Sequence, residues 1–238
     1  MARIKMREQD WLATKSLHDV FSKRSLREKD ARLLRLFAVA CTRAAMKLVP
    51  SSPQLESVAD AAESFADGSL TQDMLTKTRR VLKTAEKELG PVTDENSRVN
   101  VGPREEATFE ILRALDRATG SKVTYCASAE FAQLAFAAFA RPAYQKGSER
   151  AELQQVALAR DIFGNPFRPV AFDPAWRTAV TSGIAARMYE SRDFSAMPIL
   201  ADALEESGCT NADLLLHCRE PGVHVRGCWV VDRVLGKS

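Results

Sequence analysis

The sequence predicts an all-α protein, built as a multi-helix array of short amphipathic helices. Apolar residues recur at steps of three and four through most of the chain, which is the period of a helix with one buried face. Glycine and proline stand at the ends of these periodic segments, where they stop helices. A hydrophobic content of 45% with 27% charged residues is ordinary for a globular protein with a core.

Charge and turn residues predict how the chain is divided. Residues 1–90 are expected to form a basic N-terminal helical region, residues 91–102 a linker, and residues 103–238 a C-terminal helical region, unless all form one continuous domain. The first 50 residues carry 12 Lys and Arg against 5 Asp and Glu, whereas the remainder carries 22 against 26. A basic segment of this kind can dock on an acidic partner, on nucleic acid or on an acidic face of the same fold.

The first helices are predicted over residues 7–22, as one helix or a broken pair, and from Leu26 to Val49. The second carries an apolar stripe that includes Leu34, Phe37 and Cys41, and Pro50 ends it. A second face of this helix carries a row of cations, and contact with nucleic-acid phosphates is the alternative to a solvated face. The cations of this row are Arg32, Arg35, Arg43 and Lys47.

Five further helices are predicted before a proline-rich connector. Their expected ranges are Pro53–Ala66, Thr71–Leu89, Pro103–Thr119, Lys122–Ala140, and a helix through Leu153 and Ile162 that Gly164 closes. The helix over 122–140 is apolar around much of its circumference and is expected to be deeply buried.

The connector near residues 164–174 contains Pro166, Pro169 and Pro174, which forbid a helix before Asp173. Asp173 is expected to cap the next helix, Ala175–Ser191, with Pro174 in its first turn. Helices follow at Ala196–Ser207 and Asn211–Arg219, the second with a capping box of Thr210 and Asp213. The final segment, Val225–Leu235, is predicted to be either a helix or a short strand.

The motifs of the second half resemble those of a family of paralogous bacterial proteins of planctomycete type. The resemblance is clearest in Asp-Ile-Phe-Gly-Asn-Pro-Phe-Arg-Pro-Val at 161–170 and in His-Val-Arg-Gly-Cys-Trp-Val-Val-Asp at 224–232. It extends to both ends of the chain and is weakest over residues 91–146. The resemblance implies no particular reaction.

The C-terminal quarter holds two of the three histidines and three of the five cysteines, so it is the candidate site for a metal ion. Thiolate and imidazole are the ligands of tetrahedral zinc sites. The candidate zinc ligands are Cys209, His217 or its neighbour Cys218, His224 and Cys228. The spacing argues against this set, because adjacent helical residues point about 100° apart and no Cys-x-x-Cys pair is present.

Two other interpretations of the same segment are open. A nucleophilic Cys218 or Cys228 could pair with His217 or His224, since a thiolate needs a nearby base and an electropositive niche. Alternatively, a polar network could fasten the last segment to the connector, with Arg226 as its best fork donor. The members of that network are His224, Arg226 and Asp232.

The favoured function is a non-enzymatic helical interaction or adaptor module whose partner is another protein. The chain contains none of the nucleotide-binding, metalloprotease or serine-hydrolase motifs, so no catalytic residue is assigned and no cofactor is expected. The alternatives are nucleic-acid binding by the basic helices, and a zinc-binding protein or Cys/His enzyme that uses the C-terminal segment. The lack of an export signal, of a membrane-length apolar run and of an even cysteine count predicts a cytoplasmic protein without membrane contact.

Overall fold

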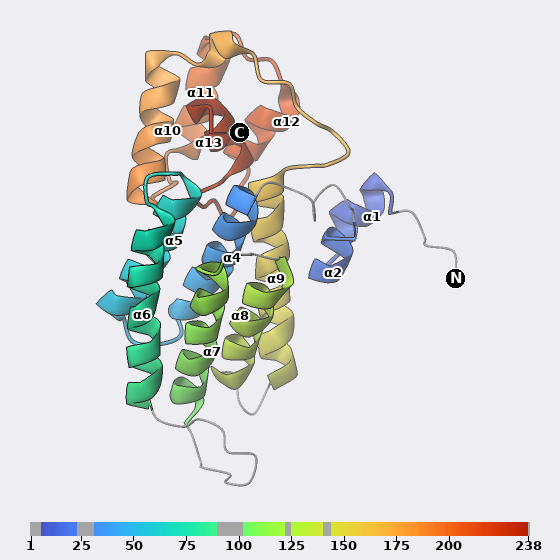
Figure 1. Cartoon of the computed structure of the whole chain (residues 1–238). Coiled ribbons are helices and arrows are strands. Elements are labelled where there is room, and N and C mark those ends of the chain that lie inside the picture. Colours follow the sequence, from blue (N-terminus) through green and yellow to red (C-terminus); the bar gives the residue numbers. More distant parts are fainter. Residues whose placement is uncertain (1–5, 23–30, 90–101, 122–124, 140–143, 238) are drawn as a thin grey trace. The chain divides into compact units, whose positions relative to one another are not determined.

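The computed structural model describes residues 6–22, 31–89, 102–121, 125–139 and 144–237, and these residues are all-α (Figure 1). They form twelve α-helices and one turn of 3-10 helix, and the described part contains no strand. The fold class predicted from the sequence is therefore confirmed. No helix of the described part is both long and apolar enough to span a bilayer.

The chain divides into two compact units, Met1–Val156 and Ala157–Ser238. This division differs from the expected boundary at residues 91–102, which lie almost wholly outside the described residues. The helices on both sides of that segment pack together in unit 1, and the division falls instead inside a long helix, α9 (Tyr144–Phe163). An unbroken helix shows no composition change, so the boundary leaves no signal in the sequence.

Unit 1 is organised around α4 (Ala31–Met46), on which α5 (Pro53–Ala66), α7 (Pro103–Ala118) and α8 (Tyr125–Phe139) pack. Every residue of α4 from Leu34 to Thr42 is buried, so this helix is enclosed on all sides and does not present one apolar stripe. Its Arg35 is buried and donates hydrogen bonds to the carbonyl oxygens of Ala118 and Gly120. The other helices of unit 1 are α1 (Glu8–Ala13), α2 (Leu17–Val20) and α6 (Gln72–Leu89).

Unit 2 continues from the end of α9 into the connector and four helices. Their cores meet in one apolar cluster that includes Met188, Leu200, Leu214 and Val230. The helices are α10 (Ala179–Ser191), α11 (Met197–Glu206), α12 (Ala212–Arg219) and α13 (Trp229–Leu235). The segment that was ambiguous between helix and strand is thus a loop followed by a helix.

Two of the predicted helix starts in unit 2 are wrong. Asp173 caps only the 3-10 turn η1 (Pro174–Trp176), and α10 begins later, where the Thr178 hydroxyl accepts a hydrogen bond from the Thr181 N–H at 3.2 Å. The start of α12 is capped by the Asn211 side chain, which accepts from the Leu214 N–H at 3.0 Å. In both places several residues of cap-forming type stand close together, and each can cap a helix.

Three contacts fix the helix ends and the last loop of unit 2. Gly164 ends α9 with a φ of +63°, a conformation that glycine adopts without steric cost, and Trp229 packs against it. A loop joins α12 to α13, and Arg226 in this loop fixes it to α10 by donating a hydrogen bond of 2.7 Å to the Tyr189 carbonyl oxygen. Arg177 in turn donates to the carbonyl oxygens of Arg233 and Val234 at the end of α13.

Candidate metal centre

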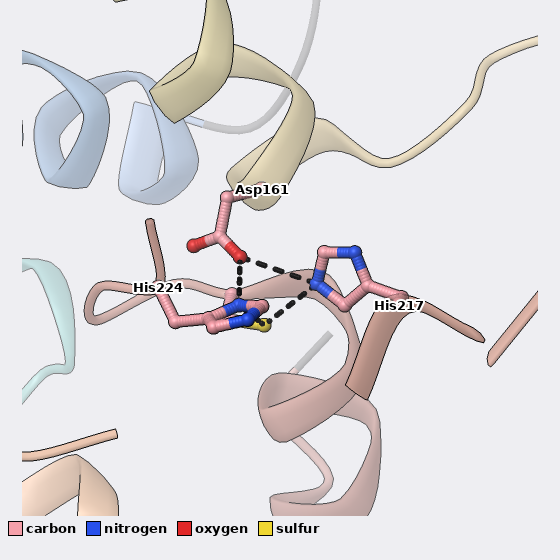
Figure 2. Close-up of side chains that lie close together, drawn as sticks. Asp161, His217 and His224 are labelled. Atoms are coloured by element: carbon pink, nitrogen blue, oxygen red, sulfur yellow. Dashed lines mark hydrogen bonds and ion pairs between the residues drawn. The ribbon is translucent and has the colours of Figure 1, made fainter. Parts of the chain in front are cut away.

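Four side chains with metal-ligating atoms converge in unit 2. Asp161 lies in the last turn of α9, His217 in the last turn of α12, and His224 and Cys228 in the loop between α12 and α13. Figure 2 shows the Asp161 carboxylate and the two imidazole rings directed at one another, with the sulfur atom beside them. One potential ligand atom from each of the four residues lies within 4.8 Å of all the others.

The separations of these atoms are close to those of a tetrahedral metal site, and two of the four match it. Asp161 Oδ1 is 2.7 Å from His224 Nδ1 and 3.2 Å from His217 Nε2. Cys228 Sγ is 3.3 Å from His217 Nε2 and 3.9 Å from His224 Nδ1. Zinc bonds of about 2.0–2.1 Å to N or O and about 2.3 Å to S place neighbouring tetrahedral ligands about 3.3–3.6 Å apart. The separations of His217 from Asp161 and from Cys228 agree with this range, whereas His224 lies closer to Asp161 and farther from Cys228, so its ring would have to shift by about half an ångström to bind the same ion.

Each imidazole uses a single nitrogen toward both of its partners. His217 Nε2 faces Asp161 and Cys228, and His224 Nδ1 faces the same two residues. In a nucleophile–histidine–carboxylate triad the ring stands between the other two groups and uses its two nitrogens on opposite sides. The arrangement is therefore focused on one point, as in a metal site, and is not a relay of the kind that activates a thiol.

Asp161 supplies the negative charge at this point and is held in place by the backbone. Its side chain is almost fully buried, and its second oxygen, Oδ2, accepts a hydrogen bond of 3.0 Å from the Val225 N–H. Burial acts to raise the pKa of Asp161, but the hydrogen bonds from His217 and His224 outweigh it and hold this pKa below its ordinary value. A carboxylate with one oxygen fixed by an amide offers the other oxygen as a single, oriented ligand.

Cys228 is fully buried, and its burial raises the pKa of the thiol well above the ordinary range. A nucleophilic cysteine needs the reverse, a depressed pKa and access to solvent. The backbone N–H groups of Val230 and Val231 approach the sulfur and favour its charged form. Such amides, together with a bound cation, are the means by which a buried thiolate is stabilised as a metal ligand.

The two histidine rings pack against each other, and Trp229 packs against one of them. The His217 and His224 rings meet edge to face with centroids 5.0 Å apart, and the Trp229 ring lies 5.1 Å from that of His217. The His224 side chain keeps only 9% of its surface exposed and that of His217 20%. His217 is therefore the more exposed of the two rings.

The sequence identified three of the four converging residues. His217, His224 and Cys228 belong to the group, whereas Cys209 does not, and His217 rather than Cys218 is the member contributed by α12. Cys209 and Cys218 are both buried, and burial raises the pKa of Cys218 to about 12. Sequence reasoning missed Asp161, although a carboxylate next to Ile162 and Phe163 in an apolar helix end is a residue that needs a buried partner.

The three residues of the predicted polar network all lie in unit 2. His224 bonds to Asp161, Arg226 donates to the carbonyl oxygens of Tyr189 and Glu190, and Asp232 is buried in α13. Arg226 therefore fastens the α12–α13 loop to α10. An Arg fork on the last carbonyls of a helix also satisfies groups that the helix leaves unpaired.

Most cations of the predicted nucleic-acid face are engaged within unit 1. Arg32 pairs with Asp67 at 3.0 Å, and Arg43 pairs with Glu56, Asp60 and Glu63 of α5. Arg35 is buried, as described above. In this row only Lys47 is exposed, so the contacts favour a structural role, and nucleic-acid binding by these residues stays a prediction.

Comparison with protein-family models found none that matches the chain, and comparisons with curated proteins and with solved structures found no similar protein. The resemblance to planctomycete-type proteins is thus not tested by them.

Proposed function

We propose that unit 2 is a zinc-binding module in which Asp161, His217, His224 and Cys228 together hold one zinc ion. The observation that carries the proposal is the convergence of their four ligand atoms within 4.8 Å. A structural site provides its ligands from elements that are already held by a core, and here the ends of α9 and α12 and the loop before α13 do so. Zinc would link the end of α9 to the end of α12 and to the α12–α13 loop.

The ligand chemistry selects zinc over the harder divalent ions. One thiolate and two imidazoles are poor ligands for Mg²⁺ or Ca²⁺, which prefer oxygen. Zinc accepts sulfur, nitrogen and carboxylate oxygen in one tetrahedral site. A site of one cysteine and two histidines also resembles copper electron-transfer centres, but those place a weak, distant ligand where this chain has the charged Asp161.

The role of the ion would be structural. Four protein ligands complete a tetrahedron, whereas a catalytic zinc keeps one position for water or substrate. This role is compatible with the interaction or adaptor function that the sequence favoured, because a closed site shapes a surface and does no chemistry of its own. The partner protein of such a module stays a prediction.

Elemental analysis of the purified, tag-free full chain tests the proposal. We expect about one zinc per chain for the wild type, and a large loss of zinc in His217→Ala and Cys228→Ser. Two matched variants, His18→Ala and Cys209→Ala, remove the same residue types outside the centre and should retain the metal. Copper in place of zinc would correct the identity of the ion. Wild-type protein that stays metal-free after refolding with zinc under reducing conditions would refute the proposal.

A further inference from the structure

Unit 1 contains a pocket that is independent of the metal centre. It has a volume of about 320 Å³ and lies between α6 and α7, with Phe131 of α8 on one side. Leu82 and Leu112, which are both buried, form its apolar part. A volume of this size is at the lower end of pockets that take small molecules.

The rim of the pocket carries an excess of positive charge. Its cations are Arg79 and Lys83, one turn apart on α6, and Arg113 and Arg117, one turn apart on α7. The lining also contains two carboxylates, Glu86 and Asp116. Two facing helices thus present four cations against two anions around one concave surface, and such a surface concentrates anions from solution.

The cations differ in how much of their charge is already compensated. Arg79 is committed to Asp116, with Nη2 only 2.6 Å from the carboxylate. Arg113 lies 3.5 Å from Glu110, a contact that leaves most of its guanidinium donors unused. Lys83 and Arg117 have no ion-pair partner in the described part of the chain. Three of the four cations can therefore bond to a ligand.

Phe131 orients two of these cations. The guanidinium carbon of Arg113 lies 4.8 Å from the centre of its ring and that of Arg117 5.9 Å. Stacking uses the flat face of a guanidinium and leaves its N–H groups available at the edge. The ring thus holds two guanidinium groups in place before a ligand binds. Each of them can donate two parallel N–H hydrogen bonds to one phosphate group.

We propose that this pocket binds a small phosphate-bearing molecule, whose phosphate groups contact Arg113, Arg117 and Lys83. The apolar wall of Leu82 and Leu112 would receive the uncharged part of that molecule. The pocket is too small for a polymer to be enclosed, so a free metabolite suits it better than a nucleic-acid strand.

Isothermal titration calorimetry of the full chain with inorganic pyrophosphate tests this proposal at constant ionic strength. We expect saturable binding with one site per chain. Arg117→Gln and Lys83→Gln should each weaken it about tenfold or more, as the loss of a charge-assisted hydrogen bond does. Arg117→Lys keeps the charge but not the fork and should restore only part of the affinity.

Matched variants distinguish the pocket from general charge attraction. Lys77→Gln and Arg104→Gln remove one cation each from the opposite faces of α6 and α7, and they should bind pyrophosphate like the wild type. Circular dichroism and thermal melting establish that each variant is folded.

Three results would overturn the proposal. The first is no saturable binding of pyrophosphate to the wild type in the millimolar range, and the second is an equal loss of affinity in the matched variants. The third is a preference for citrate or for a single-stranded oligonucleotide over pyrophosphate, which would assign the pocket to carboxylates or to a polymer.

Discussion

Replacement of Asp161 by asparagine separates a zinc centre from a set of ordinary hydrogen bonds. Asparagine keeps the shape of the side chain and an oxygen that can accept the Val225 N–H. It removes the negative charge that faces His217 and His224. Under the zinc proposal, the variant should lose most of the stability that depends on added zinc, in addition to any stability that it loses without metal.

The size of the effect follows from linkage between binding and folding. Free zinc at about 1,000 times its dissociation constant adds about 4 kcal/mol to the free energy of unfolding of the folded, zinc-binding state. If loss of the carboxylate weakens zinc about 100-fold, the same zinc concentration adds only about 1.4 kcal/mol. For a domain of about 60–100 residues, each kcal/mol moves the melting temperature by about 4–8 °C. The zinc-induced rise in melting temperature should therefore shrink to about a third.

Differential scanning calorimetry of the full chain, with zinc and with a chelator, measures the two shifts. Hydrogen exchange of peptides from α12 and α13 assigns the affected transition to unit 2. Asp173→Asn is the matched control, because Asp173 is exposed, lies outside the centre, and is replaced by an equally good capping residue. Equal zinc shifts in the wild type and Asp161→Asn, or no shift in either, would refute the reasoning.

Two further predictions concern the thiol and the glycine next to the centre. Because burial raises the pKa of Cys228, its proton stays bound in the metal-free protein at neutral pH, and zinc must displace it. We expect about one proton per zinc from this thiol, a zinc affinity that falls as the pH is lowered, and a smaller proton release in Cys228→Ala, all measured by calorimetry in buffers of different ionisation enthalpy. In Gly164→Ala the new Cβ would stand 3.2 Å from Trp229 Cγ at a positive φ, so unfolding should need about 1–3 kcal/mol less free energy in chemical denaturation. Gly183→Ala in α10, where a Cβ meets no atom within 4 Å, should instead leave the protein as stable as the wild type or stabilise it by up to about 1 kcal/mol. A smaller loss of unfolding free energy in Gly164→Ala than in Gly183→Ala would contradict the packing of Trp229 on Gly164.

The helices were predictable because their signals are local. The bounds of α5 agree with the predicted helix at both ends, since Ser52 caps it with Pro53 in its first turn and the apolar period ends at Ala66. The burial of α4 on all sides was not predictable from its own stripe. Its second face packs in the fold through alanines and through the Arg35 side chain, whose charge suggested solvent. The burial of Arg35 depends on carbonyl oxygens that lie more than 80 positions away in the sequence, so the pattern of α4 alone could not predict it.

The candidate site was predictable only in part, for a related reason. His217, His224 and Cys228 lie within twelve residues and could be grouped by density, but Asp161 lies 63 positions before His224. Of the adjacent residues His217 and Cys218, only His217 belongs to the converging group, in line with the angle of about 100° between neighbouring side chains of a helix. Cys209 was grouped with these residues because of its type, and spacing alone gave no reason to exclude a buried thiol.

The hydrogen-bond chemistry of the metal-free centre explains why a cation suits it. His217 Nε2 can donate one proton, yet it faces two groups, Asp161 and Cys228, and His224 Nδ1 faces the same two. If both histidines donate to the carboxylate, neither of the ring nitrogens that face Cys228 can also accept the thiol proton. A divalent ion at the common point would displace the thiol proton, each imidazole proton would move to the other ring nitrogen, and the ion could then bond to all four atoms. This shared use of one nitrogen per ring is a second argument for the proposed zinc site.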